Sequence, residues 1–384
     1  MALVVSRNHA YVASHNCQDN ENYIMNTHKI AVIPGDGIGE EVIEAGKTVL
    51  QQLAEKSGEI RFEFTDFDWS SKRYLEKGEY IPEGGLDELK QFDAIYFGAV
   101  GSQKVADHIS LWDLRLAICQ GFDQYANVRP ARVLPGVTSR LNGADAIDWA
   151  IVRENSEGEY SGNGGRVHQG LPEEVGTEVS VFTRKGVERI HRFAFELAAS
   201  RPRKKLLLVT KSNAQRHGMV LWDEIFFEVA KDFPEVEIQR ELVDAVTTRM
   251  VLKPDTIDTV VATNLHADIL SDLAAALSGS LGIAPTANLN PSRQFPSMFE
   301  PIHGSAFDIA GQGIANPIGS FWTAAMLLEH LGEQTSADRL MRAVEAVTAS
   351  GLHARDLGGD ATTAQITDAV CARIEDDTKS QAVG

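Results

Sequence analysis

The sequence predicts an α/β fold built on a large, mostly parallel sheet, and three observations lead to this prediction. Short apolar runs alternate with longer amphipathic stretches along most of the chain, which is typical of parallel strands covered by helices. A chain of 384 residues is long enough for two domains, or for one large α/β unit with a substantial core. Its 43% of hydrophobic and 23% of charged residues are ordinary values for a soluble globular protein.

Four strand–helix pairs carry this alternation. In each pair a short apolar run is followed by a stretch whose apolar residues recur at helical spacing. The pairs are IAVIP (30–34) with EEVIEAGKTVLQQLAEK (40–56), AIYFGAV (94–100) with HISLWDLRLAIC (108–119), KLLLVTK (205–211) with VLWDEIFFEVAKDF (220–233), and TVVATN (259–264) with DILSDLAAALSG (268–279).

A glycine-rich turn, PGDGIG (34–39), follows the first strand and resembles the dinucleotide fingerprint G-x-G-x-x-G. The match fails, because Glu40 occupies the position of the third glycine. Glu40 and Glu41 suit the N-terminus of a helix, but they would repel a pyrophosphate bound there. Glu59, about 20 positions on, precedes the next strand instead of ending it. The sequence therefore predicts the sheet but no Rossmann phosphate site at this turn.

The alternation stops in the middle of the chain. Residues from about 155 to 185 are rich in Gly, Thr and Val, a composition that predicts an antiparallel hairpin or protruding arm. An arm with few apolar residues of its own needs a partner surface, so we expect a homodimer.

Net charge and hydropathy exclude two classes of partner. The formal net charge is −18, which argues against binding to nucleic acid and to anionic membrane surfaces. No segment approaches the roughly 18 consecutive apolar residues of a transmembrane helix. If the substrate is an anion, arginines must be concentrated around it to overcome this overall charge.

The cysteines and the N-terminus bear on the compartment. Cys17, Cys119 and Cys371 lie far apart without a CxxC motif, so neither a disulfide framework nor a zinc site is expected. This use of cysteine predicts a reducing, cytoplasmic location. Residues 1–24 lack the long apolar region of a signal peptide, and we expect a disordered extension, or an upstream start with Met25 as the working one.

A pair of aspartates indicates a possible metal site. Asp268 and Asp272 stand four residues apart on a predicted helix, so both carboxylates share one face. They form either a solvated acidic face or, because the surrounding stretch is apolar, a buried pair that binds a cation. Oxygen ligands alone favour Mg²⁺ or Mn²⁺ over zinc, and a third acid is then needed from elsewhere.

Other polar residues follow the ends of predicted strands, where α/β folds bind their ligands. Arg129 in NVRPAR and Arg153 in IVREN are either surface arginines or bidentate carboxylate clamps. Tyr160 follows Arg153 after seven residues. Lys211 comes directly after the apolar run LLLV, and a lysine placed there in a cleft can act as a base, although most lysines do not.

Together these segments resemble one family, the metal-dependent β-decarboxylating 2-hydroxyacid dehydrogenases that include the isocitrate and isopropylmalate enzymes. The resemblance runs from about Lys29 to the C-terminus. The segments that carry it, in chain order, are PGDGIG (34–39), NVRP (127–130), VREN–EGEY (152–160), TKSN (210–213), DILSD (268–272) and EPIHGSA–DIAGQGIANP (300–317). FPSMFEPIHGSAFD and HISLWDLRL are most similar to the branch that acts on tartrate and D-malate.

The resemblance implies a two-domain, isopropylmalate-dehydrogenase-like fold that is not a Rossmann fold. Residues 25–126 and 278–384 would form the larger domain, and residues 127–277 would form the second domain with the dimer interface. The implied reaction is NAD-dependent oxidation of a small 2-hydroxy dicarboxylate with metal-assisted β-decarboxylation. Mn²⁺ or Mg²⁺ would be the metal, with a monovalent cation as an additional candidate.

The resemblance also assigns roles to individual residues. Arg129 and Arg153 would bind the substrate carboxylate, Tyr160 would protonate the product carbanion, and Lys211, from the partner subunit, would promote loss of the hydroxyl proton. Asp244, also from the partner, would join Asp268 and Asp272 around the metal. The implied cofactor residues are Ile38 and Asn213 near the nicotinamide, and His303, Gly304, Ser305, Asp308 and Asn316 around the adenosine. Asp308 would favour NAD over NADP, since a carboxylate repels a 2′-phosphate.

One departure from the family pattern concerns the substrate. The family usually has an arginine ten residues before the position of Arg129, and here that position is Cys119. Arg115 lies one helical turn earlier on the same face, and we hypothesise that Arg115 supplies the lost charge, with Asp113 beside it. Burying the charge of Arg115 against an isopropyl group would cost free energy. We therefore rank a small dicarboxylate above 3-isopropylmalate as the candidate substrate. The alternative outside the enzymes is a non-catalytic regulatory subunit.

Overall fold

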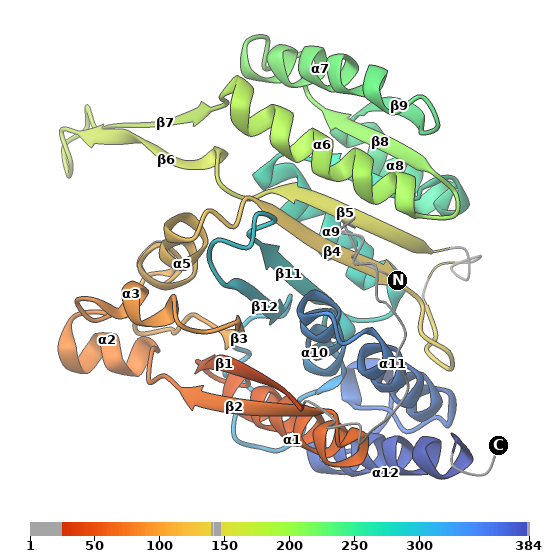
Figure 1. Cartoon of the computed structure of the whole chain (residues 1–384). Helices are drawn as coiled ribbons and strands as arrows, with labels where there is room; N and C mark the ends of the chain where they lie inside the picture. The colour runs from red at the N-terminus through yellow and green to blue at the C-terminus, as the bar shows by residue number, and fades with distance from the viewer. Residues whose placement is uncertain (1–24, 140, 142–146, 382–384) are drawn as a thin grey trace, which may run out of the picture.

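A computed structural model describes residues 25–139, 141 and 147–381, and the predicted N-terminal extension, residues 1–24, lies outside them. A ten-stranded sheet with helices on both faces dominates the molecule (Figure 1). In pairing order its strands are β2 (Ile60–Asp66), β1 (Asn26–Gly35), β3 (Ala94–Ala99), β12 (Ser297–Pro301), β11 (Pro285–Leu289), β4 (Ala126–Arg132), β5 (Asp148–Glu154), β10 (Thr259–Ala262), β8 (Lys205–Thr210) and β9 (Glu237–Leu242). The predicted α/β class with a large, mostly parallel sheet is confirmed. No helix in the described ranges is long and apolar enough to cross a membrane.

The sheet consists of two parallel blocks joined at its centre. Strands β2, β1, β3 and β12 run parallel to their neighbours, and so do β5, β10, β8 and β9. Between the blocks, β11 and β4 pair antiparallel with each other and with the adjoining strands. The first block comes from both ends of the described chain and the second from its middle. The division into domains at 126–127 and 277–278 follows this split and stays a prediction.

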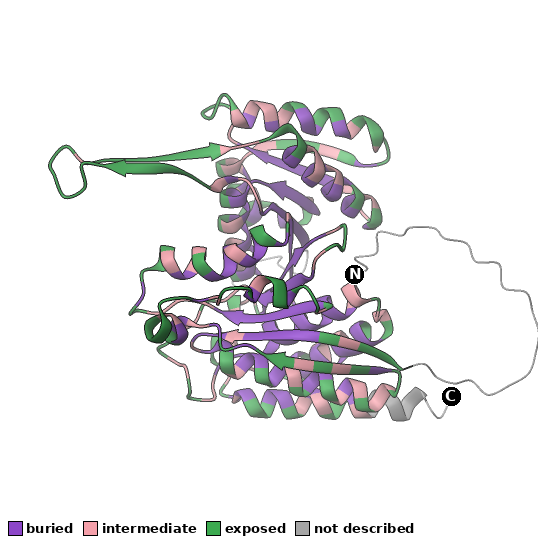
Figure 2. Ribbon diagram, turned by 60° about the vertical axis from the view of Figure 1, so that its left-hand side comes forward, coloured by how far each residue is buried: buried purple, intermediate pink, exposed green. Residues whose placement is uncertain are grey.

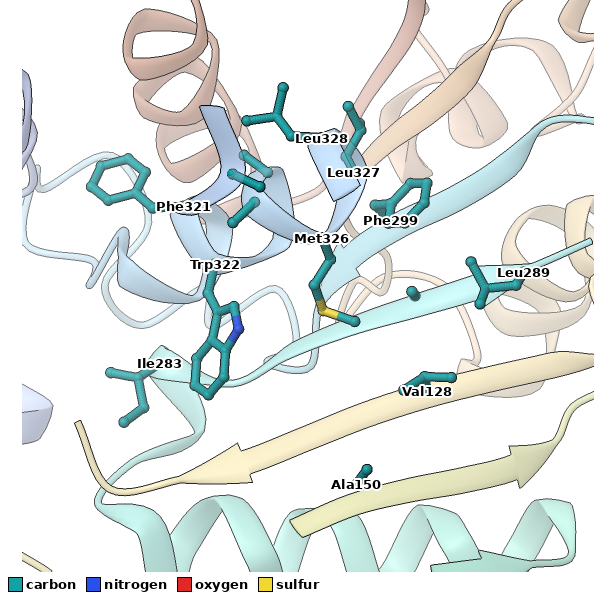
Figure 3. Packing of buried hydrophobic residues seen from close by; sticks show 14 of the residues in the cluster. Val128, Ala150, Ile283, Leu289, Phe299, Phe321, Trp322, Met326, Leu327 and Leu328 are labelled. Carbon is teal, nitrogen blue, oxygen red and sulfur yellow. The ribbon is translucent and has the colours of Figure 1, made fainter. Parts of the chain in front are cut away.

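One face of the sheet carries a continuous apolar core that spans both blocks. The alternation of side chains along each strand sends Val128 of β4, Leu289 of β11 and Phe299 of β12 to this face (Figure 3). Trp322 and Met326, on a helix that is buried along most of its length, pack against them. The helices on this face are α1 (Gly39–Ser57), α6 (Arg184–Ser200), α7 (Gly218–Val229), α10 (Ile318–Leu331), α11 (Gln334–Ala349) and α12 (Thr363–Gln381).

The opposite face carries two separate apolar clusters instead of one. The first lies under the short helices α2 (Ser71–Lys77), α3 (Gly85–Leu89), α4 (Asp107–Ser110) and α5 (Ala117–Gly121), and the second lies under α8 (Val243–Leu252) and α9 (Asn264–Ser278). Between them, the central strands present polar side chains on this face. The centre of the sheet is therefore where a functional site can form.

The helix expected at 108–119 is only partly regular. α4 and α5 are joined by a π-helical turn, Leu111–Leu116, in which each backbone hydrogen bond spans five residues instead of four. Such turns recur at functional sites, and this one carries the buried Arg115. The sequence could not predict it, because its apolar spacing is compatible with an ordinary α-helix.

The predicted hairpin is present as β6 (Gly158–Val167) and β7 (Val175–Val181). The two strands pair only with each other, with Val167 opposite Val175. They extend away from the body of the molecule, and nearly every residue of the arm is exposed (Figure 2). The base of the arm contacts the rest of the chain through Glu159, which accepts from Thr263, and Tyr160, whereas the part from 162 to 180 is almost entirely exposed.

Candidate active site

Strand alternation assembles a polar row at the centre of the sheet. Side chains alternate between the two faces in β4, β5, β11 and β12. Every second residue therefore points away from the apolar core, to the opposite face. They are Asn127, Arg129, Arg153, Asn288 and Glu300, and all are buried. Burying so many polar groups is tolerated only when each has partners, and the hydrogen bonds below supply them.

Two of the arginines converge on one carboxylate. Arg129 Nη1 lies 3.1 Å from Asp268 Oδ1 and donates to Ser271 Oγ at 2.7 Å. Arg153 Nη1 is ion-paired with the same Asp268 oxygen, while its Nε donates to Asn264 Oδ1 at 2.9 Å. The arrangement is that of a carboxylate clamp, with a carboxylate of the protein itself held in it.

The charges of this group shift the pKa values of its members. Burial would raise the pKa of Asp268, but Arg153, Arg129 and Arg115 together lower it below its ordinary value. Burial and the nearby Arg153 lower the pKa of Arg129 to about 10. Both groups therefore stay ionised at neutral pH.

Tyr160 stands beside this clamp. Its hydroxyl donates to Asp268 Oδ2 at 3.5 Å, and the Arg153 guanidinium lies 5.4 Å from the centre of its ring. Burial, followed by the negative charge of Asp268, raises the pKa of the phenol. A phenol, with an ordinary pKa of about 10, keeps its proton at neutral pH and can donate it as a general acid.

The two aspartates predicted as metal ligands lie one turn apart on α9. Burial and the nearby Asp268 raise the pKa of Asp272, with Arg129 acting in the opposite direction. A cation between two such carboxylates would relieve their repulsion, and their oxygens suit Mg²⁺ or Mn²⁺. No group of three potential metal ligands occurs within the described residues of one chain.

The predicted base and the third predicted acid contact each other instead. Lys211 follows β8, and its Nζ donates to Asp244 Oδ1 of α8 at 2.5 Å. The side chain of Asp244 is exposed, and that of Lys211 is 28% exposed. Within one chain the structure therefore does not bring these two residues to the Arg129–Asp268 group.

The predicted cofactor segments lie against each other although 270 residues separate them. Ile38 N donates to Ser305 O at 2.8 Å, and a Cβ on Gly37 would approach Ser305 O to 1.9 Å, so only glycine fits there. The carboxylate of Glu41 accepts hydrogen bonds from the backbone N–H groups of Gly311 and Gly313. Glu41 thus anchors the downstream glycine-rich loop, a role that its place in the sequence did not reveal.

The remaining predicted cofactor residues differ in their hydrogen bonds and in their exposure. His303 Nδ1 contacts Gly304 O at 3.0 Å, and its Nε2 is buried without a partner among the described residues. Asn316 donates to both carboxylate oxygens of Asp356 at 3.1 Å. Asp308 and Asn213 are exposed. The structure therefore brings the 303–316 loop to PGDGIG but shows no contact from Asn213 to either segment.

Arg115 reaches the polar row from the π-helical turn. Its Nη2 lies 2.7 Å from Glu300 Oε1 and donates to Asn288 Oδ1 at 3.2 Å. Asp113, placed beside it by our hypothesis, is exposed. The charge of Arg115 is thus balanced by Glu300, a partner that the sequence did not suggest.

Three residues of the row were not predicted from the sequence, namely Asn127, Asn288 and Glu300. Their signal is a polar residue between two apolar ones in a short strand, as in ANL and FEP. That signal cannot be read in strands of five to seven residues, because the side that faces the core becomes known only once the strands have paired.

Comparisons with known proteins bear on the family and the fold. Residues 29–370 match the family model described as isocitrate/isopropylmalate dehydrogenase. A probable tartrate dehydrogenase/decarboxylase of Agrobacterium vitis is 65% identical over 352 residues, which cover 91% of this chain and 98% of that protein. The decarboxylating D-malate dehydrogenase of Escherichia coli (strain K12) is 49% identical over 360 residues, 91% of this chain and 99% of that one. The crystal structure of isocitrate dehydrogenase from Methylococcus capsulatus superposes with a TM-score of 0.81 at 36% identity, covering 90% of this chain and 99% of that one.

Proposed function

The chain belongs to the isocitrate/isopropylmalate dehydrogenase family and has its fold, and from this we propose that it oxidises and decarboxylates tartrate or D-malate. NAD and Mn²⁺ or Mg²⁺ are the cofactors of this proposal. The observation that carries it is the convergence of Arg129, Arg153 and Tyr160 on a single carboxylate, that of Asp268. The names of the relatives from Agrobacterium vitis and Escherichia coli support the choice of substrates.

The residues of the chain divide the work as follows. Arg129 and Arg153 bind and orient a substrate carboxylate through paired charged hydrogen bonds. Lys211 of a second copy takes the proton from the 2-hydroxyl, and NAD, when bound, would supply the hydride acceptor. Tyr160 delivers its phenolic proton to the carbon that loses CO₂, and its raised pKa keeps that proton in place beforehand. Asp268 and Asp272, with Asp244 of the second copy, would hold a divalent cation, which when bound acts as a Lewis acid.

A homodimer with shared sites is part of the proposal. The arm exposes Val167, Leu171 and Val179 by more than half, and a two-stranded hairpin is marginal without a partner. On α9, Leu265 and Ile269 are exposed on either side of Asp268. A second copy covering these apolar residues would bring its own Lys211 and Asp244 toward the aspartates of α9.

A cytoplasmic location completes the proposal. Cys119 is buried, Cys371 is half-buried, and both are free, which suits a reducing compartment.

One panel of assays tests the function. The purified protein is given Mn²⁺, NAD and, in turn, tartrate, D-malate, 3-isopropylmalate and isocitrate, and NADH formation is followed together with release of CO₂. We expect the highest kcat/KM with tartrate or D-malate. A higher value with 3-isopropylmalate would identify the alternative enzyme. Silence across the whole panel would favour a non-catalytic regulatory subunit, against which the retention of Tyr160, Lys211 and the three aspartates argues.

A further inference from the structure

The Arg115–Glu300 pair is the most deeply placed ion pair beside the clamp. Arg115 Nε donates to Glu300 Oε1 at 2.8 Å, and Nη2 approaches the same oxygen at 2.7 Å. The two side chains are only 10% and 6% exposed. Asn288 Nδ2 also donates to Glu300 Oε1 at 2.8 Å, so this one oxygen has three donors around it. Arg115 Nη1 is the nitrogen of the guanidinium that has no hydrogen-bond partner within the described ranges.

A continuous set of hydrogen bonds connects this pair with the clamp. Asn288 Oδ1 accepts from Arg115 at 3.2 Å and from Asn127 at 2.6 Å, and Asn127 Oδ1 in turn accepts from Arg129 Nε at 3.0 Å. The positive charge of Arg115 also acts on Asp268 and Tyr160, whose pKa values it lowers. Arg115 therefore belongs to the same hydrogen-bonded row as Arg129 of the clamp.

The wall that contains this pair has no net charge. Glu300 balances Arg115, and Cys119 on the adjoining helix is completely buried. Burial raises the pKa of the Cys119 thiol to about 11, so it is neutral at physiological pH. Where the family usually has a third arginine, this chain thus presents a neutral surface that still has a free N–H donor.

We propose that the Arg115–Glu300 pair is a specificity determinant that selects a short polar substituent, such as a hydroxyl, at the end of the substrate beyond the clamp. An isopropyl group there would cover the free Nη1 donor without giving it an acceptor, which is costly for a buried polar group. A third carboxylate on the substrate would gain little attraction there, because Glu300 already balances the charge of the Arg115 guanidinium. This inference rests on the proposed function, because it assumes that the space beside Arg129 holds a 2-hydroxy diacid.

Binding constants test the inference separately from turnover. Isothermal titration calorimetry with Mn²⁺ gives Kd for tartrate, 3-isopropylmalate and isocitrate, while NADH formation tests the proposed function. In the double variant Arg115→Met with Glu300→Gln, we expect Kd for 3-isopropylmalate relative to tartrate to fall about tenfold, the effect of about one buried hydrogen bond. In Glu300→Gln alone, the charge of Arg115 is unbalanced, and Kd for isocitrate relative to tartrate should fall by about the same factor.

A matched control removes a similar pair elsewhere. Arg201 and Asp258 are also buried and ion-paired, at 2.6 Å, on the connections that lead into β8 and β10. Arg201→Met with Asp258→Asn should leave both ratios unchanged, and thermal melting checks that every variant is folded. Equal changes in Kd for all three acids would mean that the Arg115–Glu300 pair is only structural and would overturn the inference. Failure of the wild-type protein to bind any of the acids would overturn it too, whereas tight binding with no NADH formation would count against the proposed function alone.

Discussion

Tyr160 owes its proposed role to its surroundings, because a half-buried phenol next to a carboxylate resists losing its proton. If it is the general acid, Tyr160→Phe should lower kcat for decarboxylation by about 10²–10⁴-fold and change KM little. Steady-state NADH and CO₂ measurements check this. Tyr125→Phe is the matched control. Tyr125 is also partly buried, and the Arg189 guanidinium lies 4.1 Å from the centre of its ring. A Tyr160→Phe enzyme with near-normal kcat would remove Tyr160 from the mechanism.

His191 makes stability depend on pH at a place remote from the polar row. It is completely buried, its Nε2 contacts Trp222 O at 3.1 Å, and burial lowers its pKa from 6.5 to about 3. Native His191 thus stays neutral between these pH values, whereas in the unfolded chain it takes up a proton below about 6.5. Falling pH therefore favours unfolding, and this residue alone should reduce the free energy of unfolding by about 2 kcal/mol between pH 7.5 and 5.

Urea unfolding of the wild-type protein and of His191→Gln at several pH values measures this contribution. Glutamine can still donate to Trp222 O but does not titrate, so the difference between the two proteins should shrink as the pH falls. His217→Gln replaces an exposed histidine and should keep the wild-type dependence. Parallel curves for His191→Gln and the wild-type protein would show that His191 is not responsible.

Helix α1 connects the first glycine-rich turn with the loop proposed to bind adenosine. Glu41, in its first turn, holds the backbone N–H of Gly313 at 3.1 Å and also binds that of Gly311. Glu41→Ala would free this loop, and we expect KM for NAD to rise about tenfold while KM for the diacid stays unchanged. Glu40→Ala, at an exposed position of the same turn, is the control. An unchanged KM for NAD would mean that the loop needs no such anchor.

Apolar runs next to amphipathic helices were predictable, and contacts between elements far apart in the sequence were not. The expected strands at 30–34, 94–100, 205–211 and 259–264 correspond to β1, β3, β8 and β10, because each is an apolar run next to an amphipathic helix. Arg129 and Arg153 were expected to follow the ends of strands, but both lie within them, in β4 and β5. Glu300, by contrast, lies on a five-residue strand and meets Arg115 from a distant π-helical turn, so its partner is set by tertiary packing alone.

The layout of the whole sheet explains why the clamp forms at its centre. On one face, a single apolar core crosses both parallel blocks, whereas the other face splits into two clusters. The antiparallel strands β11 and β4 lie where the blocks meet, and they contribute Asn288, Asn127 and Arg129 to the gap between the clusters. The core on the first face thus supports a polar site on the second.

In this layout Lys211 is paired with Asp244 and apart from Tyr160, so a dimer with shared sites makes a distinctive prediction. Lys211→Met and Tyr160→Phe should each be almost inactive alone. When the two variants are coexpressed or refolded together, half of the dimers combine both chains, and each of these has one site without any substitution. We therefore expect about a quarter of wild-type activity from the mixture. If Lys211 and Tyr160 of the same chain acted together, no mixture could restore activity, and the shared site would have to be abandoned.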